Sequence, residues 1–434
     1  MSYKKLKDKA AILLRNHMFR HVAFLTTSSA AGRLVAFVSL PVITRIYSPS
    51  SFGQFSIFAA TLGLLVPIAT LRFSAAIPLP RHSGLAINLF YLCLITTSAV
   101  ALISAALLGS TMLFAEHLNV PGPSAYYWLI VVGLLGVGLF ETLNAWALRR
   151  KKFKPIAIAQ MSQSFWSVAL KVVLGLLGLK AGGLILGHVV SMTAGVASLA
   201  RATRGDIAKA SRFVSFRRMR IASRRFAAFP KLRLPAQFLL AFASQFPILF
   251  VGFFYGKGVA GQIGLTLTCI AIPISLVGAS LGQVFFAEMA KLGKGQPEKI
   301  RDLIRSLLYS SGALILLPVV VLALLGPGLF TFVFGEEWLL AGIFAQIFSL
   351  YLGVQFCAVP LVNTFSVFGD QKSFLVINGV RVALIIGVFL VTYLLKLDEV
   401  FALTLFSAVL TVHYIYVIWS VFKMVDQACL KNVS

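Results

Sequence analysis

Twelve apolar runs follow one another along the 434-residue sequence, and their lengths constrain its fold more than any other feature. A helix needs about 20 mostly apolar residues to cross the hydrocarbon core of a bilayer. The runs lie at 22–45, 52–75, 84–108, 123–148, 155–179, 182–201, 233–256, 259–287, 303–325, 338–363, 374–395 and 400–422. Charged residues make up only 12% of the sequence, too few to cover a soluble chain of this length. We therefore predict an all-α polytopic membrane protein with about twelve transmembrane helices.

The distribution of Lys and Arg predicts the orientation of these spans. If the N-terminus is cytoplasmic, 32 of the 39 basic residues lie in segments or helix ends on that side, and three lie inside spans. The opposite side holds the remaining four, which are Arg45, Lys180, Lys257 and Lys396. Because cytoplasmic loops collect Lys and Arg, we expect both termini in the cytoplasm. The same bias explains the net charge of +26 without nucleic acid as a partner.

The most basic segment, 201–233, separates the first six spans from the last six. The first span of each half is followed by a similar motif, Tyr47 to Gln54 (YSPSSFGQ) and Tyr255 to Gln262 (YGKGVAGQ). Two copies of six helices enter the membrane from the same side, so the repeats would be parallel. We predict an N-terminal six-helix lobe at 1–204, a basic cytoplasmic linker at 205–229 and a C-terminal six-helix lobe at 230–434. Two such lobes imply a cavity between them and alternating access.

Basic residues outnumber acidic ones within the spans. A charge at the bilayer centre costs about 2.5–3.5 kcal/mol, so such residues usually face protein or water. The basic candidates are Arg33, Lys171 and Arg381 within spans and Arg45 and Arg72 near span ends. Guanidinium groups bind phosphate through paired hydrogen bonds, so this excess favours an anionic headgroup as ligand. Glu141 is the one acid plainly inside a span. It could serve as a charge partner, for example of Arg33, or as an ion-coupling group.

Motifs of the common enzyme classes are absent. The sequence contains no GxxxxGK[ST] phosphate loop, no HExxH and no CxxC, and its four cysteines lack metal-ligand spacing. GASLG at 278–282 matches GxSxG, but it lies inside a span, where small residues serve helix packing. We expect no metal, no cofactor and no enzymatic activity.

Two stretches resemble a known family. LPVITRIYSPSSFGQ, from Leu40 to Gln54, and LRFSAAIPLP, from Leu71 to Pro80, are similar to the first two spans of the polysaccharide-transporter (Wzx-type) flippases. These belong to the multidrug/oligosaccharidyl-lipid/polysaccharide (MOP) exporter superfamily, which implies a V-shaped fold. The chain departs from the family at Phe73-Ser74, where an acid is common, and this puts a coupling carboxylate at that position in doubt.

The resemblance implies a multi-pass flippase of the bacterial inner membrane. It would move an undecaprenyl-pyrophosphate-linked oligosaccharide, the repeat unit of O-antigen, capsule or exopolysaccharide, beside a polysaccharide polymerase and its chain-length machinery. Candidate sugar contacts are Asn144, Trp146, Gln160, Gln163, Trp166, Gln245, Asn363 and Asn378. The alternatives are a cation-coupled multidrug exporter, which would need Glu141, a non-transport protein of envelope assembly, and a cell-wall precursor flippase.

Overall fold

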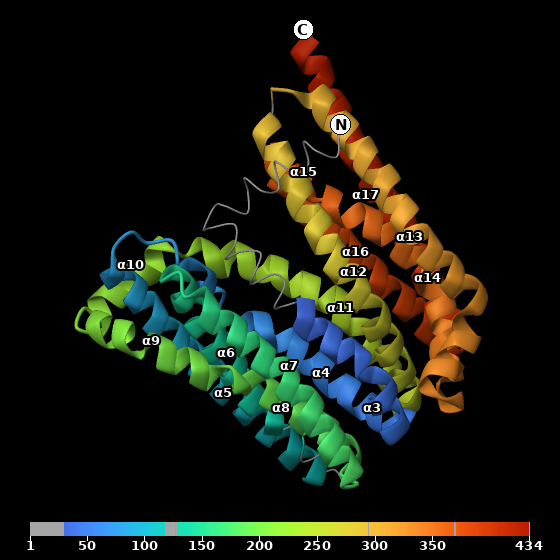
Figure 1. The fold of residues 1–434 in the computed structure, drawn as a ribbon, viewed down its shortest axis with the longest axis horizontal. Coiled ribbons are helices and arrows are strands. Elements are labelled where there is room, and N and C mark those ends of the chain that lie inside the picture. The colour runs from blue at the N-terminus through green and yellow to red at the C-terminus, as the bar shows by residue number, and fades with distance from the viewer. Residues whose placement is uncertain (1–29, 118–125, 127, 294, 369, 434) are drawn as a thin grey trace. The chain divides into compact units, whose positions relative to one another are not determined.

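The computed structural model describes residues 30–117, 126, 128–293, 295–368 and 370–433, and within these ranges the chain is helical without β-strands (Figure 1). It divides into two compact units. The first comprises Met1–Ile46 and Thr61–Phe238, and the second comprises Tyr47–Ala60 and Leu239–Ser434. The predicted all-α membrane fold is confirmed.

The first helix that the structure describes in the first unit is broken. Residues 30–38 are helical, Ser39 forms a turn, and the helix resumes as α3. Pro41 has no N–H to donate to the preceding turn, which explains the interruption. The remaining elements are α3 (Leu40–Ile46), α4 (Pro49–Ala69, which begins in the second unit), η1 (Phe73–Ala76), α5 (Ser83–His117), α6 (Trp128–Arg149), α7 (Phe153–Leu176), α8 (Lys180–Ala194), α9 (Val196–Ser211), α10 (Phe216–Arg225) and η3 (Phe229–Arg233).

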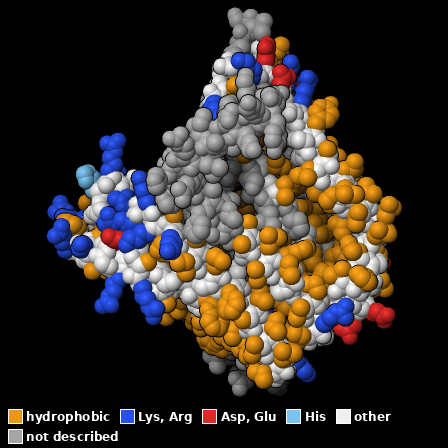
Figure 2. Space-filling model, in the orientation of Figure 1, with side chains coloured by type: hydrophobic (Ala, Val, Ile, Leu, Met, Phe, Trp, Pro, Cys, Tyr) orange, Lys and Arg blue, Asp and Glu red, His pale blue; other side chains and the backbone are white. Residues whose placement is uncertain are grey.

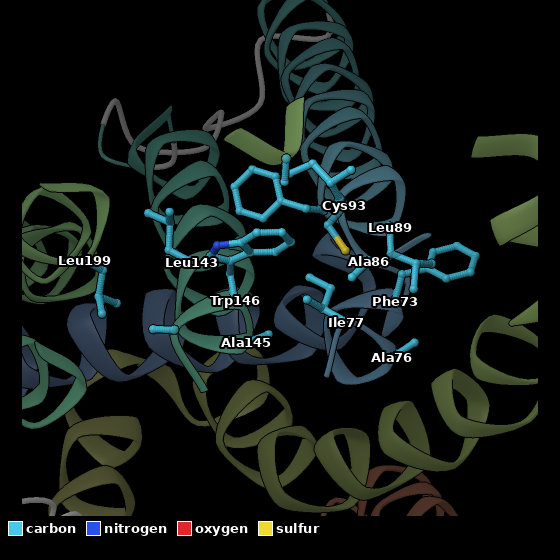
Figure 3. Close-up of a cluster of buried hydrophobic side chains, with 14 of the residues drawn as sticks. Phe73, Ala76, Ile77, Ala86, Leu89, Cys93, Leu143, Ala145, Trp146 and Leu199 are labelled. Carbon is cyan, nitrogen blue, oxygen red and sulfur yellow. The ribbon is translucent and has the colours of Figure 1, made fainter. Parts of the chain in front are cut away.

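A hydrophobic core joins η1, α5, α6, α9 and α10 (Figure 3). Trp146 of α6 is fully buried there and meets the ring of Phe90 edge to face at 5.6 Å. Ala210 of α9 and Ala222 of α10 are also buried in this core. Residues 205–229, expected as a linker, are therefore mostly helical and contribute to the packing of the first unit.

The second unit is built around α14, which packs against α12, α13 and α17. Its elements are α11 (Leu234–Phe254, which begins in the first unit), α12 (Gly256–Leu292), α13 (Pro297–Phe334), η4 (Glu336–Trp338), α14 (Leu339–Leu361), α15 (Asn363–Phe368), α16 (Gln371–Leu394) and α17 (Glu399–Val433). The buried Gln262 side chain links α12 to the start of α14, because its amide donates to the Glu337 carbonyl at 2.6 Å and accepts from the Ala341 N–H at 2.9 Å.

The two copies of the duplicated motif meet at glycines within the second unit. A Cβ at Gly53 of α4 would collide with the carbonyl of Lys257, and a Cβ at Gly261 of α12 would collide with the carbonyl of Pro49. In the aligned motifs Lys257 is the counterpart of Pro49, and Gly261 is the counterpart of Gly53. Reciprocal contacts of this kind are what a local twofold axis between two parallel copies produces.

Nine helices in the described part of the chain are long and apolar enough to cross a membrane. Hydrophobic side chains cover much of the visible face in Figure 2, and many large ones are strongly exposed, such as Phe332 at 84%. The predicted span 22–45 begins outside the described residues. The predicted span 155–179 corresponds to α7, which carries more polar residues. The predicted span 259–287 corresponds to α12, whose described apolar stretch is Gly256–Ile272. The count of twelve and the cytoplasmic termini stay predictions.

Candidate functional site

A strained turn after α4 carries the first polar cluster of the first unit. Leu71 and Arg72 have positive φ angles of 46° and 59°, in the left-handed region. This conformation costs a non-glycine residue about 1–2 kcal/mol. The turn places the hydroxyls of Thr70 and Ser74 3.1 Å apart, and both side chains are buried.

Glu141 of α6 completes this cluster. Its Oε2 accepts hydrogen bonds from Thr70 and from Ser74, each at 3.2 Å. Its Oε1 lies 3.9 Å from an Nη of Arg72, and both charged side chains are about a quarter exposed. The hydroxyls hold the carboxylate in place. Arg72 balances its charge, although their separation is near the longest distance accepted for an ion pair. Phe73-Ser74 stand where an acid is common in the family that the sequence resembles, and here Glu141 brings a carboxylate to Ser74 from another helix.

The second polar cluster lies inside the second unit, between α14, α16 and α17. Arg381 of α16 donates to the Tyr414 hydroxyl at 3.0 Å, and the Gln355 amide of α14 donates to the same hydroxyl at 2.8 Å. The Tyr351 ring lies 5.9 Å from the Tyr414 ring, and the neighbouring His413 is buried. Side chains of three helices therefore converge on the Tyr414 hydroxyl within a bundle that is otherwise mostly apolar.

The Arg381 cluster offers unused hydrogen-bond donors. Both acceptor sites of the Tyr414 hydroxyl are occupied, so its proton is free to donate. The Nε–H of Arg381 is buried without a hydrogen-bond partner. Among the described residues, no ion pair involves Arg381. A guanidinium with free donors and no carboxylate partner is suited chemically to an anion.

The other predicted basic residues do not join these clusters. Arg33 and Arg45 are exposed, and the glycine before Arg33 packs tightly against Ser164 of α7. Lys171 is half-buried and its stem packs on Gly187 of α8. Their roles in binding a headgroup stay predictions.

The predicted sugar contacts are scattered over both units. Trp146 lies in the core of the first unit, and Asn378 is buried with its amide bonded to the Phe374 carbonyl of its own helix at 2.8 Å. Trp166 is 49% exposed. The half-buried members of the set are Asn144, Gln160, Gln163, Gln245 and Asn363. A buried amide oxygen without a partner is found at Asn144.

Sequence analysis missed Thr70, Ser74, Gln355 and Tyr414 as partners of the charged residues. Hydroxyl and amide side chains are common in transmembrane helices, so only the position of their charged neighbours could have singled them out. Among the residues that the structure describes, no group of three or more His, Cys, Asp or Glu side chains could hold a metal ion.

Spanning helices with polar clusters in their interior define a polytopic membrane protein, and its fold is that of the MOP superfamily. An inward-facing multidrug-resistance MATE-family transporter of that superfamily matches with a TM-score of 0.71 at 14% identity, over 93% of this chain and 94% of that one. A MOP superfamily transporter from Pyrococcus furiosus matches with a TM-score of 0.60 at 14% identity, over 96% and 98% of the two chains. At this identity the matches establish the fold alone.

The sequence comparison identifies the family. A family described as "Polysaccharide biosynthesis protein" matches residues 42–342, and the chain belongs to that family. The succinoglycan biosynthesis transport protein ExoT of Rhizobium meliloti (strain 1021) is 24% identical over 341 residues. That match covers 77% of this chain and 66% of the relative, so the chain spans just under two thirds of the relative's length. The resemblance to polysaccharide transporters is thus confirmed.

Proposed function

We propose that this protein is a flippase of the bacterial inner membrane for an undecaprenyl-pyrophosphate-linked oligosaccharide, working by alternating access. Family membership, the MOP fold and the transport role named for the Rhizobium relative support this proposal. The repeat unit would belong to O-antigen, capsule or exopolysaccharide, and a polymerase with its chain-length machinery would receive it.

The environment of Arg381 is the observation that favours an anionic cargo. An arginine within a span is costly unless a partner satisfies it, and here one hydroxyl satisfies the half-buried Arg381 in part, while its buried Nε has no partner. A diphosphate would accept the free guanidinium and hydroxyl donors of Arg381 and Tyr414. Arg72, Lys171, Arg33 and Arg45 are proposed as further contacts for the headgroup.

The sugar part of the cargo needs hydrogen-bonding and stacking groups. The half-buried amides of Gln160, Gln245 and Asn363 and the exposed ring of Trp166 are our first candidates. Trp146 and Asn378 would serve it only indirectly, because one is enclosed in the core and the other bonds its own helix.

Transport by the purified protein in liposomes tests the proposal. The assay would follow a labelled undecaprenyl-pyrophosphate oligosaccharide from one leaflet to the other by its accessibility to a membrane-impermeant reagent. Arg381→Gln should lower the rate at least about tenfold, because a charge-assisted hydrogen bond to the headgroup is lost. Arg381→Lys keeps the charge but not the paired geometry, so we expect an intermediate rate.

Arg305→Gln provides the matched control, since it removes the same charge from an exposed residue of α13. It should transport at the wild-type rate. A wild-type protein that moves no lipid-linked oligosaccharide would refute the proposed function. An Arg381→Gln variant that transports normally would refute the role of Arg381 alone.

Export of cationic drugs is the competing function, because the structural matches include multidrug transporters. It requires an available carboxylate in the transport path, and Glu141 is the candidate that sequence analysis named. Two hydroxyls and Arg72 already engage this carboxylate, which disfavours it as the sole site for a cation. Loss of drug resistance in Glu141→Gln cells with normal polysaccharide would favour drug export.

A further inference from the structure

Helix α10 presents a dense array of arginines to the solvent. Five of its ten residues are arginines, and all five are exposed: Arg217, Arg218, Arg220, Arg224 and Arg225. In Figure 2 blue side chains gather at the end of the molecule where Figure 1 labels α9 and α10. The array follows from the sequence FRRMRIASRR, whose small Ala222 turns inward.

Three of the five arginines form one face of α10. Ala222 is fully buried and marks the side that packs on the protein. At about 100° per residue, Arg217, Arg220 and Arg224 fall within about 60° of one another and on the opposite side. We call these three residues the arginine face. Ile221 lies beside it and is 51% exposed.

Hydrogen bonds fix α10 against the start of α5. The buried Asn88 amide donates to the Phe213 carbonyl at 3.0 Å, and its oxygen accepts from the Ser215 N–H at 3.1 Å. Ser215 caps α10 by accepting from the Arg218 N–H at 3.2 Å. The arginine face is therefore held in place by the fold of the first unit.

Within the described part of the chain, acids leave most of the positive charge of residues 201–233 unbalanced. Asp206 is the one acid between residues 201 and 233, and it pairs with Lys152 of the α6–α7 turn at 2.6 Å. No ion pair found among the described residues involves an arginine of α10. An external anionic partner would supply the missing charge.

We propose that the arginine face binds the anionic phospholipid headgroups of the membrane that the protein spans. Residues 212–228 connect two candidate spans, Lys180–Ser211 and Phe229–Phe254, so α10 is tied to the membrane on both sides. Guanidinium groups bind phosphodiesters through paired hydrogen bonds. Ile221 and the 83% exposed Phe216 give the basic helix the apolar side chains that enter a lipid interface. This inference is independent of the cargo.

Hydrogen exchange of the full-length protein in nanodiscs tests the proposal. Peptides covering 212–228 should exchange at least about tenfold more slowly in discs containing phosphatidylglycerol than in pure phosphatidylcholine, since each basic residue adds attraction to an anionic surface. The difference should vanish in about 1 M NaCl, where the Debye length is about 3 Å.

Variants separate lipid binding from folding. The Arg217→Gln, Arg220→Gln, Arg224→Gln triple variant should lose the protection by phosphatidylglycerol, whereas the Lys triple at the same positions should keep most of it. Lys299→Gln with Arg305→Gln removes exposed charge from α13 and should leave α10 protected. Equal exchange in both lipids would overturn the proposal. The proposal would also be overturned if α10 were protected only after polyuridylate or an acidic peptide is added to phosphatidylcholine discs.

Discussion

Glu141 illustrates how a single charged residue can be structural within a transporter fold. Its ion pair with Arg72 is long, at 3.9 Å, and partly exposed. Pairs of this kind contribute about 0–1 kcal/mol. The hydrogen bond from the fully buried Thr70 hydroxyl contributes more, about 1.5–3 kcal/mol, because its acceptor is charged.

We therefore predict that Glu141→Gln transports within about twofold of wild type and loses about 1–2 kcal/mol of stability, because the hydrogen bonds from Thr70 and Ser74 lose their charged acceptor. Thr70→Val should lose about 1–3 kcal/mol, measured by denaturant unfolding in detergent. Thr404→Val is the control, since its exposed hydroxyl bonds only the Val400 carbonyl of its own helix. A well-folded Glu141→Gln protein without transport would instead assign ion coupling to this carboxylate.

The pairing at Glu141 also marks where sequence reasoning stops at the residue scale. The cost of a charge in a span predicted that Glu141 would be satisfied by some partner. Which partner it meets depends on the left-handed turn at Leu71 and Arg72, and neither residue type favours that conformation. The same holds for Arg381, whose hydroxyl partner comes from a helix 33 residues further along the chain.

At the scale of elements, the contact between α4 and α12 depends on two glycines. Gly53→Ala should destabilise the protein by about 1–3 kcal/mol or more, because its Cβ would meet the rigid backbone carbonyl of Lys257. Gly261→Ala should behave alike, because its Cβ would meet the carbonyl of Pro49.

Gly258→Ala is the internal comparison for these glycines, measured as the midpoint of thermal unfolding in one detergent. It lies in the same helix as Gly261, and nothing is within 4 Å of its added Cβ. This variant should gain up to about 1 kcal/mol from the higher helix propensity of alanine. A Gly53→Ala protein as stable as Gly258→Ala would show that the two helices separate without cost.

The helices themselves could be predicted because a long apolar run has few alternatives to a spanning helix. The Tyr-x5-Gly-Gln repeat likewise indicated a duplication before the contact of its glycines was known. The packing of α10 could not be predicted, because eleven basic residues conceal the spacing of Ala210 and Ala222. The turn between these two alanines is held by the distant Asn88 through Phe213 and Ser215, which a basic composition does not reveal.

For the whole molecule, the orientation in the membrane remains the prediction with the widest consequences. Twelve spans place 32 of 39 basic residues on the cytoplasmic side and four on the other. Lys180 and Lys396 belong to the four and are exposed, Lys180 at the first residue of α8 and Lys396 in the turn before α17. The exposed Arg224 belongs to the basic side. In cells carrying a variant without the native cysteines, Lys180→Cys and Lys396→Cys should react with an external impermeant maleimide. Arg224→Cys should react only after permeabilisation.

Six predicted spans lie between Lys180 and Lys396, so both residues should be on the same side of the membrane. Labelling of one but not the other would require an odd number of crossings between them. That result would exclude the twelve-span arrangement.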